Sequence, residues 1–301
     1  MGDDGAMASL DRWDSERMES ARDHLVRVWS RRQARKLEPI VLDPDLVSAQ
    51  SKQALDQVWS RLGIFDSEAG PVWVIDDSSA PTVVLVEAHV APVGSQAAQL
   101  MEALLEQYPQ ARSLGIEVVP SDPWSVAIGE LDGFTSRATN MHRSLPAPGP
   151  QTPVMLAPMT RAEFAAFQAW QIEDYIQDLI GTGMAEDTAR AEASTQVSTL
   201  LLGGLETPDT DLMTAWVDGV DVGVLWLDYT RGYAFVYNVM VREPMRGRGL
   251  GRAVMNAGAG RALERGMTGI GLNVFAANPT ARSLYDSLGY LVTADHRIRD
   301  L

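Results

Sequence analysis

A basic, glycine-rich turn between a strand and a helix constrains this 301-residue chain more than any other feature. The turn spans residues 241–251 and reads Val-Arg-Glu-Pro-Met-Arg-Gly-Arg-Gly-Leu-Gly. Residues 233–241 before it have the β-branched and aromatic composition of a strand, and Leu250, Val254 and Ala257 after it recur at helical spacing. Alternate glycines let a ligand approach the backbone closely, and a helix N-terminus presents free amides to phosphate. We therefore expect a phosphorylated ligand at this turn.

Composition limits both the class of chain and the class of partner. Apolar residues make up 46% and charged residues 22%, which is typical of a globular protein, and the apolar runs are too short to span a membrane. Residues 1–35 are polar and charged without an apolar signal segment, so we expect a cytoplasmic protein. The chain has no cysteine and four scattered histidines, so we expect no disulfide, no cysteine nucleophile and no metal site. A net charge of −15 argues against nucleic acid and is compatible with cationic small molecules, or with solubility alone.

The sequence repeats itself about a proline-rich midpoint. Residues 145–153 contain four prolines and predict an extended linker. Residues 123–145 align without a gap on residues 279–301. In the first copy Val93-Gly-Ser-Gln replaces the glycine turn, and Gly129 stands where the second copy has Tyr285. We expect two copies of one fold, of which only the second has the phosphate site.

The second half of the chain predicts the element order βααβββαβαβ. Strands are expected at residues 154–157, 212–217, 222–227, 234–241 and 269–275 and at the terminus, and helices at residues 161–180, from about 186, at 250–265 and at 279–288. The apolar positions that define the first two helices are Ala165, Ala169, Ile172, Ile176 and Leu179, then Ala189, Ala193, Val197 and Leu200.

This order and two motifs resemble the GCN5-related N-acetyltransferase (GNAT) superfamily. Arg246-x-x-Gly249-x-Gly251 is similar to its most diagnostic pattern, and Asn278-x-x-Ala281-x-x-Leu284-Tyr285-x-x-Leu288-Gly289-Tyr290 is similar to its second. The turn is not Gly-x-Gly-x-x-Gly, because Arg252 fills the last position, and it lacks the Gly-Lys-Ser/Thr ending of a nucleotide P-loop.

The resemblance implies an α/β (α+β) fold of two GNAT-like domains, each with a mixed, mostly antiparallel central sheet flanked by helices. Residues 1–147 would form a degenerate domain without the pyrophosphate loop, and residues 152–301 the acyl-CoA-binding catalytic domain. Tandem arrangements with one degenerate copy occur in this superfamily, and the mycothiol synthases look like a distant example.

The resemblance also implies an acyl-CoA-dependent N-acyltransferase, which transfers an acyl group to the amine of a small molecule by direct attack. Acetyl-CoA would be the usual acyl donor, and another acyl-CoA is the alternative donor. One alternative is an acyl-CoA-binding sensor without catalysis, and another is coenzyme A binding by both domains. We expect a monomer or homodimer that acts without nucleic acid or membrane.

In such enzymes the loop amides hold the pyrophosphate, and the preceding strand pairs with the pantetheine arm where it splays from its neighbour. The residues implied for this role are Val239, Val241, Arg246, Gly247, Arg248, Gly249, Leu250, Gly251, Arg252 and Asn278. Arg242, Arg248 and Arg252 could equally be solvated charges, and Asn278 could cap its helix.

Tyr285 stands where the family often has a general acid for the departing thiolate, although a tyrosine closing the core is the alternative. The general base is less defined, because Asn238 and Met240 occupy the strand where relatives often have an acidic residue. The candidates are Tyr237, Asp228, Glu173 and Asp174, with a solvated helix face as the alternative for the last two.

The family recognises its acceptor through the region that corresponds to residues 161–205. Its acidic side chains, interleaved with Trp170 and Tyr175, would suit a cationic amine, or would form a charged outer surface over an aromatic core. These side chains are Glu163, Glu173, Asp174, Asp178, Glu186 and Asp187.

Overall fold

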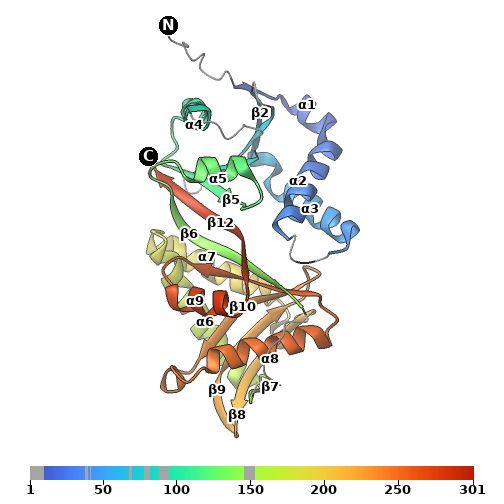
Figure 1. Ribbon diagram of the computed structural model, residues 1–301, viewed down its shortest axis with the longest axis vertical. Coiled ribbons are helices and arrows are strands. Elements are labelled where there is room, and N and C mark those ends of the chain that lie inside the picture. The colour runs from blue at the N-terminus through green and yellow to red at the C-terminus, as the bar shows by residue number, and fades with distance from the viewer. Residues whose placement is uncertain are drawn as a thin grey trace. The chain divides into compact units, whose positions relative to one another are not determined.

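The computed structural model describes residues 10–37, 40, 42–67, 70–77, 82–87, 95–145 and 153–301. Most of the expected linker and the start of the Val93-Gly-Ser-Gln segment lie outside these ranges. The chain divides into two compact units, whose elements are labelled in Figure 1. Unit 1 comprises Met1–Glu38, Leu42–Thr139 and Val292–Leu301, and unit 2 comprises Pro39–Val41 and Asn140–Leu291.

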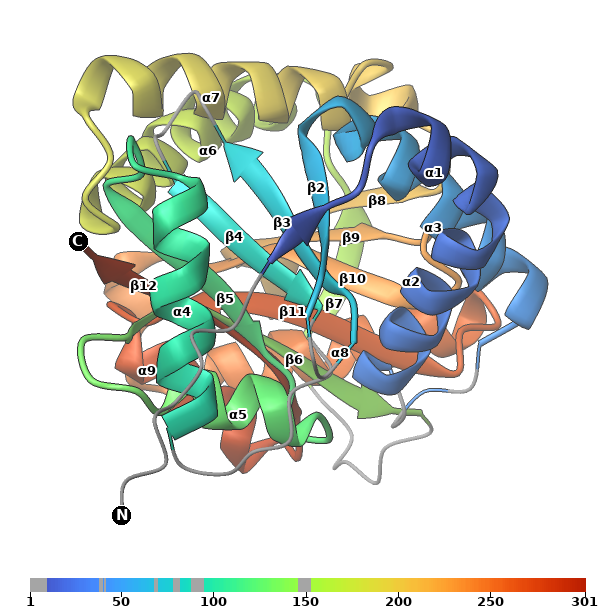
Figure 2. The ribbon, with the colours of Figure 1, turned by 90° about the horizontal axis from the view of Figure 1, so that it is seen from above.

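Unit 1 has strands in the order β1-β2-β3-β4-β5-β12, with α2 and α3 on one side and α4 and α5 on the other (Figure 2). Only the β4–β5 pair among these neighbours is parallel. The elements in chain order are β1 (Asp11–Arg12), α1 (Ser15–Ser20), α2 (Arg22–Lys36), α3 (Pro44–Val58), η1 (Trp59–Arg61), β2 (Leu62–Asp66), β3 (Val72–Asp77), β4 (Thr82–Glu87), α4 (Ser95–Gln107), β5 (Ser113–Val118), α5 (Pro123–Gly129) and β6 (Thr135–Ser144).

Unit 2 has strands in the order β11-β10-β9-β8-β7, with α6 and α7 on one side and α8 and α9 on the other (Figure 2). Its β10–β11 pair is parallel and the other three pairs are antiparallel. The elements of the second half of the chain are β7 (Met155–Pro158), α6 (Arg161–Gly181), α7 (Glu186–Leu200), η2 (Gly204–Glu206), β8 (Thr210–Val217), β9 (Val220–Asp228), β10 (Ala234–Val241), η3 (Glu243–Met245), α8 (Leu250–Glu264), β11 (Gly269–Phe275), α9 (Pro279–Ser287) and β12 (Leu291–Asp300), of which β12 belongs to unit 1 from Val292 onward.

The predicted element order of the second half is confirmed, and β10 and β11 have the expected bounds. Unit 1 shows the same order when α1 and α2, which only Ala21 separates, are taken together. The mixed, mostly antiparallel sheets flanked by helices are therefore present in both units, as expected for two copies of one fold.

The expected apolar face of α6 is partly wrong. Ala165 and Ala169 are exposed, whereas Phe167 and Gln171 are buried. The helix packs on the sheet through Phe167 and on α7 through Ile176, so its buried surface is wider than a single stripe. On α7 the expected positions hold, because Ala189, Ala193 and Val197 are buried.

The last strand of each half belongs to the sheet of the other half. Strand β12 comes from the end of the chain and pairs antiparallel with β5 in unit 1, with Arg297 opposite Ile116. Residues 140–144 of β6 belong to unit 2, next to β11, where the Asn273 side chain donates to Asn140 Oδ1 at 2.8 Å. Each unit is therefore completed by a strand from the opposite half of the sequence.

Candidate functional site

The parallel pairing of β10 and β11 stops early. It runs from Ala234 to Val236 on β10, although the strands continue to Val241 and Phe275. On its other side β10 pairs with β9 through to Val241, with one irregularity at Tyr237. The two parallel strands therefore separate before they end, as the family resemblance implied.

This separation leaves one edge of β10 without a strand partner. The Arg242 amide donates to the Val222 carbonyl of β9 at 2.9 Å. Because residues of an antiparallel strand alternate in the direction of their backbone groups, Met240 also faces β9, whereas Val239 and Val241 face the open edge. The structure thus places the backbone of the two predicted residues where an extended ligand could pair with it.

The glycine turn joins this edge to α8 through left-handed backbone. Gly247 and Gly249 have φ angles of 77° and 75°, and an added Cβ would meet no atom within 4 Å at either. Glycine is thus required by conformation rather than by a lack of room. At Gly251 the reason is packing, since a Cβ would lie 3.2 Å from Leu284 Cδ2.

The N-terminus of α8 has no protein cap. Gly249 is the N-cap residue, and it provides no side chain to accept from the following amides. The first amides of a helix have no partner within the helix, and they carry its partial positive charge. With Leu250 and Gly251 in the first turn, the arrangement suits a phosphate group.

Two arginines of the turn have different environments. The Arg246 side chain donates through Nε to the Val241 carbonyl at 3.1 Å, so it supports the bend between strand and turn. Arg248 is exposed and makes no hydrogen bond or ion pair within the part of the chain that the structure describes. Its charge is therefore available to a ligand.

Two further arginines are held by protein groups. Arg242 makes a two-pronged ion pair with Asp221, with Nη2 to Oδ2 at 2.8 Å. Arg252 donates to the Ser287 hydroxyl at 2.6 Å and so ties the start of α8 to the end of α9. Both side chains stabilise the frame of the site.

Helix α9 places the second motif. Asn278 caps this helix, because its Oδ1 accepts from the Ala281 amide at 3.0 Å. Tyr285 is 7% exposed, its ring centroid lies 5.8 Å from that of Tyr290, and burial raises the pKa of Tyr285 to about 12. The phenol is therefore neutral near pH 7 and can donate a hydrogen bond.

Two of the predicted base candidates are engaged in other contacts. The Tyr237 hydroxyl accepts from Arg231 Nη2 at 2.8 Å. Asp228 accepts from the Thr230 hydroxyl at 2.8 Å. Glu173 is exposed on α6, where it accepts from Gln177 at 3.1 Å and pairs with Arg190 at 3.7 Å.

The remaining acids of the expected acceptor region fall into two groups. Glu163 forms the capping box of α6 with Thr160, and Glu186 pairs with Arg190 at 3.2 Å. Asp187 is exposed on α7. These three side chains stabilise helices or face solvent.

Asp174 and Asp178 differ from all of these acids. Both are half-buried one helical turn apart, and their carboxylates have no hydrogen bond or ion pair within the described chain. Burial and the charge of Asp174 raise the pKa of Asp178 to about 6. Burial also raises the pKa of Asp174, although the charge of Arg246 opposes this. Sequence reasoning included Asp178 only in the acidic region, because its burial is not visible in the sequence.

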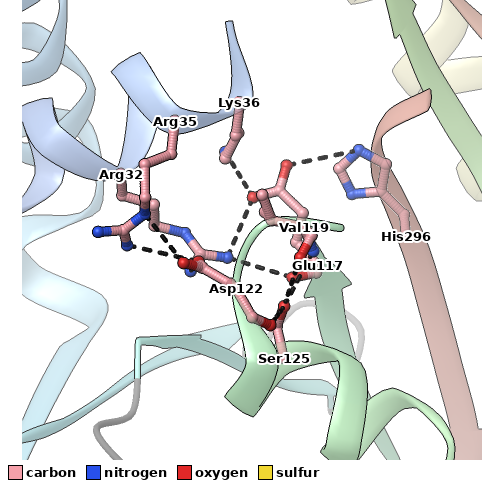
Figure 3. Close-up of polar contacts among 8 residues, drawn as sticks. All are labelled: Arg32, Arg35, Lys36, Glu117, Val119, Asp122, Ser125 and His296. Atoms are coloured by element: carbon pink, nitrogen blue, oxygen red, sulfur yellow. Dashed lines mark hydrogen bonds and ion pairs between the residues drawn. The ribbon is translucent and has the colours of Figure 1, made fainter. Parts of the chain in front are cut away.

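Unit 1 has a different arrangement at the corresponding place (Figure 3). Asp122 directly precedes the proline that begins α5, as Asn278 does for α9. Arg32 of α2 is 2% exposed and bridges Asp122, at 3.3 Å, and Glu117 of β5, at 3.4 Å. Lys36 also pairs with Glu117. Cations and carboxylates that are buried or half-buried thus pair with one another in this unit.

The described residues contain neither a membrane-spanning helix nor a metal-binding cluster. No helix in these ranges is long and apolar enough to cross a membrane. No group of three or more histidine, aspartate or glutamate side chains within them is placed to hold a metal ion.

Comparison with known proteins identifies the family. Residues 166–290 match the profile of the "Acetyltransferase (GNAT) family". The uncharacterized N-acetyltransferase YycN of Bacillus subtilis is 34% identical over 148 residues, which are 46% of this chain and 94% of that protein.

Two solved structures share the fold over nearly the whole chain. The GCN5-related N-acetyltransferase of Sphaerobacter thermophilus matches with a TM-score of 0.59 and 16% identity, over 98% of this chain and 96% of that one. A tandem GNAT protein from the clavulanic acid biosynthesis pathway matches with a TM-score of 0.50 and 16% identity, over 97% and 98% of the two chains. The glycine turn and the separated strands agree with the family profile and with these relatives. The chain therefore belongs to the GNAT family of N-acetyltransferases.

Proposed function

We propose that residues 152–301 transfer an acetyl or other short acyl group from coenzyme A to the amine of a small molecule. The observation that carries this proposal is the continuous backbone surface formed by the open edge of β10, the left-handed turn and the uncapped start of α8. It offers amides and carbonyls to an extended pantetheine arm, followed by amides and Arg248 for the pyrophosphate.

The chain's own residues account for the main chemical requirements. The backbone of Val239 and the amide of Val241 face the open edge of β10 and would orient the thioester, and an amide there would donate to its carbonyl oxygen as negative charge develops. The neutral Tyr285 would donate a hydrogen bond to the departing sulfur. Attack by the amine itself requires no covalent enzyme intermediate.

We further propose that residues 1–147 form a degenerate copy that does not bind coenzyme A. Gly129 occupies the place of Tyr285, and a Cβ there would overlap the Val118 side chain. Asp122, the counterpart of Asn278, is paired with Arg32 and Arg35. Both features oppose a thioester site in unit 1.

The test is acyl transfer by the purified chain. Acetyl-CoA and a panel of small primary amines are supplied, and free thiol and amide product are measured together. We expect thiol release that depends on the amine. Saturable coenzyme A binding without turnover on any amine would favour the sensor, for which the absence of an acid on β10 is the supporting observation.

A further inference from the structure

The sheet-facing side of α6 changes from aromatic to polar along its length. Phe167 packs edge-on against Trp226 of β9, with ring centroids 6.1 Å apart. The positions that follow on the same side, at spacings of three and four residues, are Gln171, Asp174 and Asp178. A helix face over a sheet is normally apolar, so three polar side chains in succession need an explanation.

The first of these side chains is buried without a partner. Gln171 is 7% exposed, and its Oε1 atom makes no hydrogen bond within the described residues. Leaving a buried polar atom unpaired is costly, and native structures rarely do so without a ligand, water or function.

The facing strand shows the same property. Asn238 lies opposite Trp226 in the β9–β10 register, so both side chains are on the α6 side of the sheet. The Asn238 Oδ1 atom is also buried and unpaired within the described chain. Helix α6 and strand β10, which both pack against Trp226, thus each carry an unsatisfied amide oxygen on the α6 side of the sheet.

This region lies beside the separated strands. The Tyr175 ring lies 6.4 Å from that of Phe275, the last residue of β11. The Arg246 charge acts on Asp174, which connects the same part of α6 with the end of β10. The polar side of α6 is therefore adjacent to the place where the thioester would lie under the proposed function.

The two carboxylates on this side form no ion pair within the described residues, although the charge of Arg246 acts on Asp174. In unit 1 the buried Asp122 and the half-buried Glu117 are each paired with basic side chains of α2. On α6, by contrast, the carboxylates of Asp174 and Asp178 have no such partner among the described residues. A half-buried pair of like charges is stabilised when a cation binds between or beside them.

We propose that Asp174 and Asp178, together with the amides of Gln171 and Asn238, form the acceptor subsite and bind a small aliphatic amine in its ammonium form. The proposal rests on the proposed acyltransferase function for its catalytic step. An amine with a neighbouring carboxylate, such as an α-amino acid, would be repelled, whereas an aliphatic polyamine is favoured.

The same pair provides the missing base. The ammonium gives one proton to Asp178, and the freed nitrogen electron pair forms the C–N bond to the thioester carbon. The C–S bond breaks with its electron pair on sulfur. The second nitrogen proton passes to sulfur through the Tyr285 hydroxyl, which gives one proton and takes one. Asp178 then releases its proton to solvent, which leaves an amide and a free thiol.

The test measures binding and turnover separately in four proteins: wild type, Asp174→Asn, Asp178→Asn and Glu173→Gln. The last is the matched control, because it removes an exposed carboxylate from the same helix. Spermidine binding to the coenzyme A-loaded protein is followed by calorimetry at physiological salt, and coenzyme A affinity reports that each variant is folded.

We expect each aspartate variant to weaken spermidine binding about tenfold or more, since a charge-assisted hydrogen bond is worth roughly 1.5–3 kcal/mol, while Glu173→Gln binds as wild type. Equal binding by all four proteins, or no saturable binding by wild type, overturns the proposal. Turnover distinguishes the two claims. If wild type binds spermidine through the pair without acetylating it, the subsite stands and spermidine transfer fails. If acetylation proceeds equally in the aspartate variants, the acyltransferase stands and the subsite fails.

Discussion

Helix α2 of unit 1 and helix α6 of unit 2 occupy the same place in the element order, yet they carry opposite charges toward their sheets. On α2, Arg32 and Lys36 pair with Glu117 of β5, a half-buried carboxylate whose partners are supplied by the protein. On α6, Asp174 and Asp178 are half-buried without a partner within the described residues. The protein itself thus neutralises the carboxylate beside α2, whereas we propose that a bound ligand neutralises the pair on α6.

The largest effect is expected from breaking the ion pairs between α2 and β5 in unit 1. Glu117→Gln removes one carboxylate partner of buried Arg32 and a partner of half-buried Lys36, and we expect a loss of about 3–5 kcal/mol in the free energy of unfolding, because these charges are left incompletely paired. Denaturant unfolding followed by fluorescence measures this loss. Glu102→Gln, at an exposed position on α4, is the control and should change stability little. Similar stability for both variants would show that the ion pairs do not hold unit 1 together.

The next largest effect is expected on coenzyme A binding at the glycine turn of unit 2. Gly249→Val forces a β-branched residue into left-handed backbone, and we expect coenzyme A affinity to fall about a hundredfold or more as the turn is distorted. Gly266→Val is the matched control, because Gly266 has a φ of 77° and open space at the other end of α8. Calorimetry with coenzyme A measures both variants. If the control loses affinity equally, strain in α8 rather than the turn accounts for the effect.

A smaller effect, on the rate of acetyl transfer, is expected from removing the Tyr285 hydroxyl, which would donate to the departing sulfur. Tyr285→Phe removes one hydrogen-bond donor and keeps the ring, so we expect kcat for acetyl transfer to fall about 10–100-fold with coenzyme A affinity unchanged. Tyr290→Phe, which alters the adjacent buried ring, serves as the comparison. Full activity of Tyr285→Phe would leave Tyr285 with a packing role only.

The smallest effect contrasts the pH dependence of the two carboxylates. Burial alone would raise the pKa of Glu117, but the charges of Lys36, His296 and Arg32 hold it at about 2. Its contribution to stability is therefore present above its unfolded pKa, and it is lost as the pH falls from about 4.5 toward 2. The pKa of Asp178 is raised to about 6, so its ionisation destabilises the fold as the pH rises from about 4 to 6.

We therefore expect Asp178→Asn to raise the Tm above pH 6 by about 2–4 °C, corresponding to roughly 1 kcal/mol after solvent screening, with no difference below pH 4. Thermal unfolding across this range measures the change. Other charged groups lie near Asp178: Asp174 raises the pKa of Asp178, Arg246 acts on Asp174, and Glu192 acts with Asp178 on Tyr175. The change in Tm is therefore compared with the change in Asp174→Asn, which removes the neighbouring charge. A variant less stable than wild type at pH 7.5 contradicts the assignment of Asp178 as an uncompensated charge.

Much of unit 2 could be predicted from the sequence, because alternation and helical spacing are local signals. The glycine turn, the bounds of β10 and β11 and the cap at Asn278 all follow from such signals. The free backbone edge at Val239 and Val241 was implied by the family resemblance, and the strand register agrees with it.

Other features depend on tertiary structure. The exchange of β6 and β12 was not predictable, because the repeat gives the two strands the same pattern and either could complete either sheet. The polar side of α6 was not predicted, because Ala165 and Ala169 were counted as part of the buried apolar face. Alanine is small enough to be exposed, and both residues are exposed in the structure. The burial of Gln171 could not be predicted either, since residue type alone does not show whether an amide side chain is buried.

If unit 2 alone forms the coenzyme A site, as we propose, the binding stoichiometry is one coenzyme A per chain. Calorimetric titration of the whole chain with coenzyme A should give one site per chain, and Gly249→Val should abolish that site. Two sites per chain, or one site that survives in Gly249→Val, would contradict the account.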